Sequence, residues 1–328
     1  MFQRKIIIAI HGIGNKPPQP LLQQWWRRAI CEGLERIGRP RKRFKLELAY
    51  WAHFLYSEPE DVTIRDQEHP LYIRNPYVRS SGSRNSAASN WLRRHVLDLL
   101  EVIMDKVFFT QNRVFNFDRI SDYVIRRKFS DLELYYHEEN VALEETGLYA
   151  RQMIRDELAK ILRKHRRKQI LLISHSLGTV VAYDVLTQLV PEVGVHTLIT
   201  LGSPLGLPMV MKKIFAEQHK DFKDERQLTT PENIEHAWLN FSDLNDRIAM
   251  NYNLADDFSP NSHGIKPVDT VVDNDYEFKG KRNHHKSYGY LRAPEVTAVI
   301  SDFVTSGRTP VDYLRQLLGF ERAAGDRS

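Results

Sequence analysis

A serine marks the sharpest change of pattern in the chain. Residues 169–173 (Gln-Ile-Leu-Leu-Ile) predict a buried strand, and residues 179–186, which are mostly apolar, predict a helix. The pentapeptide between them, Ser-His-Ser-Leu-Gly at 174–178, has the small-x-Ser-x-Gly spacing of a strained strand-to-helix turn. Such a turn lifts its central hydroxyl clear of the sheet, so Ser176 is a candidate nucleophile.

A glycine-rich corner follows the first predicted strand. Residues 5–10 (Lys-Ile-Ile-Ile-Ala-Ile) read as a buried strand that ends in His-Gly-Ile-Gly-Asn at 11–15. A corner of this kind can direct backbone N–H groups at a developing oxyanion, although any strand-to-helix corner favours glycine. We expect His11 to brace the corner through a hydrogen bond and not to exchange a proton with a substrate.

Candidate carboxylates and imidazoles follow two later strands. Residues 236–241 and 269–278 both read as strands, and each is followed by a polar loop. The carboxyl ends of parallel strands share one edge of a sheet, where open α/β sheets build their sites. The candidate acids are Asp243 and Asp246, and the candidate bases are His284 and His285.

In these features the chain resembles the α/β-hydrolase superfamily, and within it the lipase-like serine esterases. The resemblance runs from about residue 5 to about residue 300 and is weakest between about 57 and 140. It includes the order serine, acid, histidine. Besides the pentapeptide, it rests on residues 48–52, 199–206, 238–240 and 285–291. The chain departs from the pattern at Arg247, where such esterases often carry proline.

The resemblance implies an α/β-hydrolase fold, with a mostly parallel central sheet flanked by helices. It implies a serine hydrolase that cleaves carboxylic esters, including lipid or acyl esters, through an acyl-enzyme intermediate. The implied triad is Ser176, Asp246 and His285, and Asp243 and His284 remain alternatives for the acid and the base. The backbone N–H groups of Ile13 and Leu177 would form the oxyanion hole. This chemistry requires no cofactor and no metal.

Other functions stay open at this point. A thioesterase or an amidase would use the same triad, and an inactive member of the fold could serve as a binding module. The paired histidines could instead ligate a metal together with Asp273 and Asp275, although such pairs usually lack the full set of ligands. Ser203 is a second hydroxyl after a strand, but no strand-to-helix turn surrounds it.

We predict one α/β-hydrolase domain over residues 1–328, with a cap or lid insertion at 57–140. Residues 57–90 lose periodicity, and residues 91–109 then form the strongest helical pattern of the insertion. Its apolar stripe is wider than a surface helix needs. A lid over an acyl pocket and a helix packed permanently on the core both fit this pattern.

Composition restricts the partners. The 328 residues are 42% hydrophobic, which suffices for one large core. The single cysteine, Cys31, favours a reducing compartment, and we expect a cytoplasmic protein. A net charge of +5 is too small to indicate a nucleic-acid partner, so we expect none. We expect a small-molecule or lipid ester substrate, and the oligomeric state stays open. The basic run at 163–168 fits the end of a helix beginning near residue 146. The alternative is a patch that binds phosphate or makes transient contact with a membrane surface.

The remaining elements follow from periodicity. Apolar residues at helical spacing predict helices, and alternating or continuous apolar runs predict strands. The predicted helices span 20–37, 294–304 and 310–320, and the further predicted strands span 44–54 and 194–201.

Overall fold

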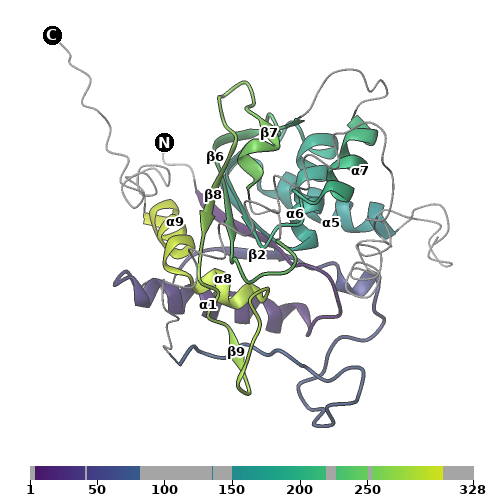
Figure 1. The fold of residues 1–328 in the computed structure, drawn as a ribbon, viewed down its shortest axis with the longest axis vertical. Coiled ribbons are helices and arrows are strands. Elements are labelled where there is room, and N and C mark those ends of the chain that lie inside the picture. The colour runs from purple at the N-terminus through teal and green to yellow at the C-terminus, as the bar shows by residue number, and fades with distance from the viewer. Residues whose placement is uncertain are drawn as a thin grey trace.

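Six parallel strands form the central sheet, in the order β2-β1-β3-β4-β6-β8 (Figure 1). The computed structural model describes residues 4–40, 43–81, 135, 150–218, 227–249 and 253–305. The strands of the sheet are β1 (Lys5–Ile10), β2 (Leu46–Ala49), β3 (Gln169–His175), β4 (Val195–Leu201), β6 (Ile234–Ser242) and β8 (Pro267–Val271). Because all six run in the same direction, their carboxyl ends meet at one edge.

Helices follow most of these strands. They are α1 (Gln19–Arg36), α5 (Ala150–His165), α6 (Leu177–Asp184), α7 (Pro208–Gln218), α8 (Ser287–Arg292) and α9 (Pro294–Thr305). Shorter turns of helix are η1 (Ala52–Phe54), η2 (Val185–Leu189) and η3 (Leu254–Asp256). Two small pairs of strands complete the description: β5 (Leu228–Thr229) with β7 (Phe258–Ser259), and β9 (Glu277–Phe278) with β10 (Lys281–Arg282).

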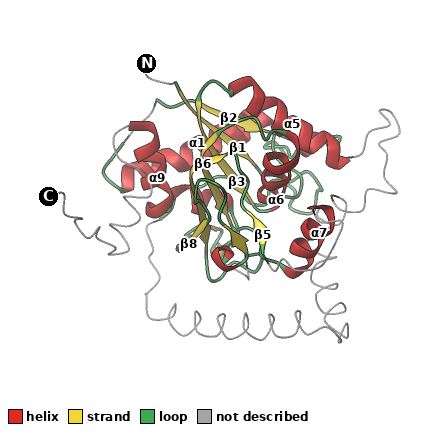
Figure 2. Cartoon of the chain, turned by 90° about the horizontal axis from the view of Figure 1, so that it is seen from above, coloured by secondary structure: helices red, strands yellow, loops and turns green. Residues whose placement is uncertain are grey.

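The sheet is covered on both faces. Figure 2 shows α1 and α9 on one side of the strands and α5, α6 and α7 on the other. Alternate side chains of β1 enter opposite cores, because successive residues of a strand point to opposite faces. Ile6, Ile8 and Ile10 pack with α5 and α6, whereas Ile7 and Ala9 pack with α1, α8 and α9. The predicted class, a mostly parallel sheet flanked by helices, is therefore confirmed.

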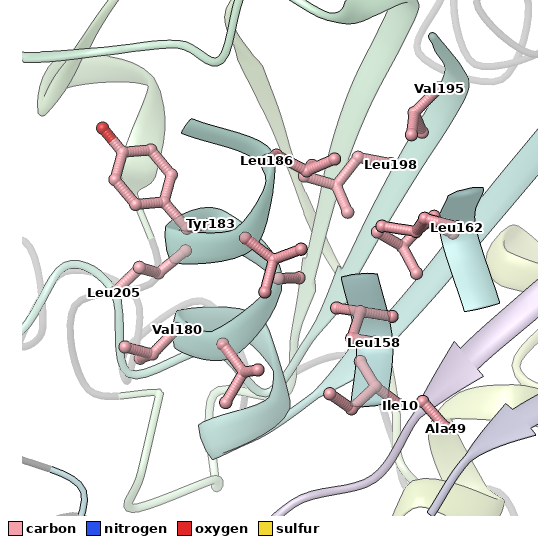
Figure 3. Packing of buried hydrophobic residues seen from close by; sticks show 14 of the residues in the cluster. Ile10, Ala49, Leu158, Leu162, Val180, Tyr183, Leu186, Val195, Leu198 and Leu205 are labelled. Carbon is pink, nitrogen blue, oxygen red and sulfur yellow. The ribbon is translucent and has the colours of Figure 1, made fainter. Parts of the chain in front are cut away.

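The core between the sheet and α6 is built from aliphatic side chains of several elements. Figure 3 shows Val180 of α6 and Leu186 of η2 together with Leu158 and Leu162 of α5 and Leu198 of β4. All five are at most 1% exposed. Burial of each such side chain is worth about 1.5–3 kcal/mol. This packing fixes the helix that begins directly after Ser176.

Two predicted strands are too long. The strand predicted at 44–54 ends at Ala49, and Trp51 turns its backbone N–H to His11 Nε2 (3.1 Å). The stretch predicted at 269–278 leaves the sheet after Val271, because the backbone N–H of Asn274 binds the carboxylate of Asp243 (2.7 Å). In both places a polar side chain captures a backbone donor that the sheet would otherwise use.

The basic run closes α5 as predicted and is partly ion-paired. Lys164 and His165 lie 2.7 Å and 2.6 Å from the carboxylate of Glu47 on β2. Arg163 lies 3.0 Å from Glu192. These contacts tie the end of α5 to its neighbours and support the structural reading of the run.

Most of the predicted insertion, including the helix at 91–109, lies outside the described residues, as does the helix predicted at 310–320. Residues 57–81 are described and form turns and one isolated bridge between Asp61 and Tyr72. Tyr135 is also described: it is buried, and its hydroxyl donates to Asp184 at the end of α6 (2.7 Å). Among the described helices, none has the length and apolar character needed to cross a bilayer.

A buried arginine joins the α1 and α8 layer to two loops. Arg292 of α8 is 0% exposed and donates to Asp275 Oδ1 (2.6 Å) and to the carbonyl of Val78 (2.7 Å). It also reaches Glu32 of α1 (3.4 Å). Arg36 touches the same two carboxylates, at 2.7 Å from Glu32 and 2.8 Å from Asp275. The network fixes α8 and the segment that precedes it.

Arg292→Met is expected to lower the free energy of unfolding by about 3 kcal/mol, the lower end of the cost of breaking a buried pair, because Arg36 still reaches both carboxylates. Urea unfolding measures the loss. The matched control is Arg79→Met, since Arg79 pairs with Glu35 on the exposed surface (2.7 Å) and its removal should change the midpoint little. Equal losses in the two variants would contradict the structural role of Arg292.

Candidate active site

Ser176 occupies a strained position at the end of β3. Its backbone has φ +55° and ψ −131°, a region that residues with a side chain rarely adopt. Two contacts hold it there: its N–H donates to the carbonyl of Leu201 (3.0 Å), and its carbonyl accepts from the hydroxyl of Thr179 (2.8 Å). The predicted strand-to-helix turn is therefore present, with Ser176 at its centre.

Two glycines let the β1 corner touch this turn. A Cβ atom placed on Gly12 would lie 2.5 Å from Cβ of Ser176, and one on Gly178 would lie 2.7 Å from the carbonyl oxygen of His11. Neither distance is tolerable, so both positions require glycine. The backbone at 11–13 thus lies against the serine and the first turn of α6.

The structure brings Ser176, His285 and Asp246 together. His285 Nε2 lies 2.9 Å from Ser176 Oγ, and His285 Nδ1 lies 2.8 Å from Asp246 Oδ2. A carboxylate can only accept, which places the imidazole proton on Nδ1 and leaves Nε2 to accept from the serine hydroxyl. The side chain of Asp246 is 0% exposed, whereas that of His285 is 25% exposed. The arrangement can therefore move a proton from the hydroxyl to the imidazole.

Asp243 and His284 form a separate pair beside this group. Asp243 Oδ2 lies 3.1 Å from His284 Nδ1 and accepts from the backbone of Asn274, while Oδ1 accepts from the backbone of Asn245 (2.6 Å). Burial opposes ionisation of Asp243, but the hydrogen bonds from His284, Asn245 and Asn274 outweigh it and lower its pKa. Asp243 therefore organises two loops, and its imidazole partner is His284.

Asp246 is held at both oxygens. Oδ1 accepts from the backbone N–H of Ile248 (2.9 Å), a local turn of the kind that aspartate favours, and Oδ2 accepts from the hydroxyl of Tyr290 (2.7 Å). Gly202, with φ +53°, provides the space: a Cβ there would lie 2.7 Å from Asp246 Oδ2 and 3.1 Å from His285 Nδ1. The carboxylate and the imidazole thus meet over a position that only glycine can fill.

The loop that carries His285 is clamped from two sides. The side-chain amide of Asn274 donates to the carbonyls of His284 (2.8 Å) and Lys286 (2.9 Å). His175 Nε2 donates to the carbonyl of His285 (2.7 Å). Burial lowers the pKa of His175 well below its usual value, so this ring is a neutral donor. His285 is therefore positioned through its backbone as well as through its ring.

His11 fixes the corner next to Ser176. Its Nε2 accepts from the backbone N–H of Trp51, so Nδ1 carries the proton and donates to the carbonyl of Gly12 (2.9 Å). Burial is the main cause that lowers the pKa of His11 well below its usual value, and the ring is neutral. No cis peptide occurs among the described residues, so the N–H of Ile13 points away from that carbonyl.

The other donor candidate opens α6. Leu177 is the first residue of that helix, and the first N–H groups of a helix have no acceptor within it. Lys16 adds a further restraint to the corner, because its ammonium donates to the carbonyls of Ile13 and Gly14. Two backbone donors, at Ile13 and Leu177, thus belong to segments that flank Ser176.

The remaining sequence candidates have other partners. Ser203 bonds to the hydroxyl of Thr179 (2.8 Å) and stabilises a turn. Asp273 lies 3.5 Å from Arg282, and Asp275 belongs to the Arg292 network. In the part of the chain that is described, no group of three or more His, Cys, Asp or Glu residues could hold a metal ion.

Sequence reasoning missed four positioning residues. They are His175, Gly202, Asn274 and Tyr290. Gly202 had the clearest signal, since a glycine directly after a predicted strand often marks a positive φ. Asn274 carried none, because it fell inside a stretch that reads as strand.

Comparison with known proteins adds little to this geometry. No family model matches the chain, and no curated protein matches it either. Among solved structures, the chain is similar to one described as the novel pyrethroid hydrolase PytH with BIF, with a TM-score of 0.32 and 12% sequence identity. That likeness covers 92% of this chain and 98% of that chain. A likeness at this TM-score does not indicate a function for this chain.

Asp243→Asn is expected to lower the free energy of unfolding at neutral pH by about 1.5 kcal/mol, a typical value for hydrogen bonds to a charged group. The folded pKa of Asp243 is depressed, so its contribution is present above the unfolded value of about 3.9 and is lost as pH falls through the folded pKa. Urea unfolding at neutral and acidic pH measures the difference from the native chain, which should shrink at low pH.

Asp273→Asn is the matched control, because burial raises the pKa of Asp273. Its carboxylate costs stability when ionised, so this variant should be as stable as the native chain at neutral pH or more stable. A pH-independent loss for Asp243→Asn would contradict the assigned role.

Proposed function

We propose that the chain is a serine hydrolase that cleaves carboxylic esters. The observation that carries the proposal is the continuous hydrogen-bonded path from Ser176 Oγ through His285 to Asp246. Three groups of the required types, in the order and orientation that nucleophilic catalysis needs, have no use in a protein that only binds. The strained backbone of Ser176 supports the same function, because strain of this kind gathers at functional sites.

In the first half of the reaction, Ser176 Oγ attacks the ester carbonyl while His285 Nε2 takes its proton. Asp246 keeps the imidazole in the correct tautomer and stabilises its charged form. The carbonyl oxygen becomes an oxyanion, for which the N–H groups of Ile13 and Leu177 are the donors. One such donor is typically worth about 2.7–4 kcal/mol. His285 then gives its proton to the departing alkoxide, and an acyl-enzyme remains.

Water completes the cycle. His285 Nε2 takes a proton from a water molecule, whose oxygen attacks the acyl carbon through a second oxyanion held by the same donors. The proton returns to Ser176 Oγ as its bond to the acyl carbon breaks, and the carboxylic acid leaves. Thioester or amide cleavage would follow the same steps. A small-molecule or lipid ester is the proposed substrate.

Ser176→Ala is expected to abolish labelling by a fluorophosphonate and hydrolysis of a short p-nitrophenyl ester, because the attacking atom is lost. Ser203→Ala is the matched control: it removes another buried serine hydroxyl, one that contacts Thr179 and not His285, and should retain most activity. Full activity in folded Ser176→Ala protein would refute the proposed nucleophile. A native chain that neither labels nor hydrolyses esters would favour the binding module.

Substitutions can show which acid–base pair, Asp246 with His285 or Asp243 with His284, contributes more to the rate of ester hydrolysis. Asp246→Asn should cut the rate by about 10³–10⁴-fold, since the amide favours the wrong imidazole tautomer. His285→Ala should be similarly inactive. Asp243→Asn and His284→Ala are the matched controls and should lose far less activity at 25 °C. The opposite ranking in ester hydrolysis would move the catalytic roles to Asp243 and His284.

A further inference from the structure

Tyr290 is bonded to both acidic loop residues at once. It lies in α8, is 0% exposed, and its hydroxyl accepts from the backbone N–H of Asp243 (3.0 Å). Because that N–H can only donate, the hydroxyl hydrogen is free for Asp246 Oδ2, which lies 2.7 Å away. Burial, and then the charge of Asp246, raise the pKa of Tyr290 well above its usual value, so the phenol stays a neutral donor.

One carboxylate oxygen of Asp246 accepts hydrogen bonds from both Tyr290 and the proposed base, His285. Asp246 Oδ2 accepts from the phenol at 2.7 Å and from His285 Nδ1 at 2.8 Å. Two donors on one oxygen share its negative charge, and a short bond from a buried hydroxyl takes up part of it. The phenol also fixes the direction of the carboxylate, since Oδ1 is already held by Ile248. Tyr290 therefore affects both where Asp246 points and how strongly it attracts a proton on the imidazole.

We propose that Tyr290 is a positioning residue for the acid–base pair, which aims Asp246 at His285 and moderates the attraction of its carboxylate for the imidazolium. The inference rests on the proposed function, in which that pair performs the proton transfers. It follows that loss of the phenol hydroxyl makes the imidazolium harder to deprotonate and makes the alignment of the ring with Ser176 less exact. Both effects act on the rate of chemistry and not on the binding of substrate.

Other ionisable groups surround the imidazole and must stay constant in a test. The ring of His175 lies with its centroid 4.8 Å from that of His285 and is neutral. The Asp243 and His284 pair lies on the adjoining loops. Lys286 follows His285 directly and interacts with Glu60, which in turn interacts with Lys16. Replacing tyrosine by phenylalanine keeps all of these ionisable side chains and the buried ring, and it removes the acceptor of the Asp243 backbone N–H together with the donor to Asp246.

The test compares Tyr290→Phe with the native chain in three measurements. These are the pH profile of kcat and KM for a p-nitrophenyl ester, an NMR titration of the His285 ring with isotopically labelled histidine, and thermal unfolding. We expect the acid limb of kcat and the imidazole titration to move to higher pH by about half a unit to one unit, less than the one to three units produced by a full neighbouring charge. We expect kcat to fall about tenfold or more, with KM little changed.

Tyr288→Phe is the matched control, because it removes another buried tyrosine hydroxyl from α8 and its ring packs against Trp25 and Tyr77. It should leave both titrations where they are. An unmoved titration in Tyr290→Phe, or a shift to lower pH, would overturn the proposal and leave Tyr290 a structural residue whose loss only lowers the unfolding temperature.

The NMR titration also separates this proposal from the proposed function. It reads the imidazole directly and needs no turnover. If the native chain hydrolyses no ester but the titration still moves in Tyr290→Phe, the hydroxyl acts as proposed and the assigned reaction fails. If the native chain is active but neither titration moves, the reaction stands and the role of Tyr290 fails.

Discussion

The direct contact between the β1 corner and Ser176 is the constraint on which the rest of the site depends. With glycine at positions 12 and 178, the corner backbone can lie against the serine and the first turn of α6. The positive φ of Ser176 then directs the hydroxyl toward the edge where the other strands end. A larger residue at either glycine would push the β1 corner away from the turn at Ser176. The other contacts of the site, which depend on the position of Ser176, would then be displaced.

Periodicity predicted the helices and strands well where burial of apolar side chains alone determines the local structure. The strand at Lys5–Ile10 has the bounds expected of a continuous apolar run, and α1 begins and ends within one residue of its prediction. Prediction failed where tertiary hydrogen bonds compete with the ladder of the sheet. Trp51 and Asn274 look like strand residues, but their backbone donors bind His11 and Asp243, which no local pattern reveals.

For the site, the sequence predicted which residues would gather and favoured Asp246 with His285, but it left Asp243 and His284 open as alternatives. Two acids three positions apart and two adjacent histidines allow several pairings, and the choice depends on how two loops meet in space. Tyr290 and His175 contribute to that choice, since one bonds Asp246 and the other bonds the backbone of His285. A tyrosine in an apolar helix reads as core, so its polar contact could not be foreseen.

The site draws on both layers of the molecule. Ser176 immediately precedes α6, which packs on one face of the sheet. His285 lies two residues before α8, which packs with α1 on the other face. The 2.9 Å contact between Ser176 Oγ and His285 Nε2 therefore depends on how the helical layers on the two faces of the sheet are aligned with each other. Heating that lets one layer slide would break this alignment while each layer kept its helices. The proposed ester hydrolysis would then stop at a temperature where circular dichroism still shows intact helices.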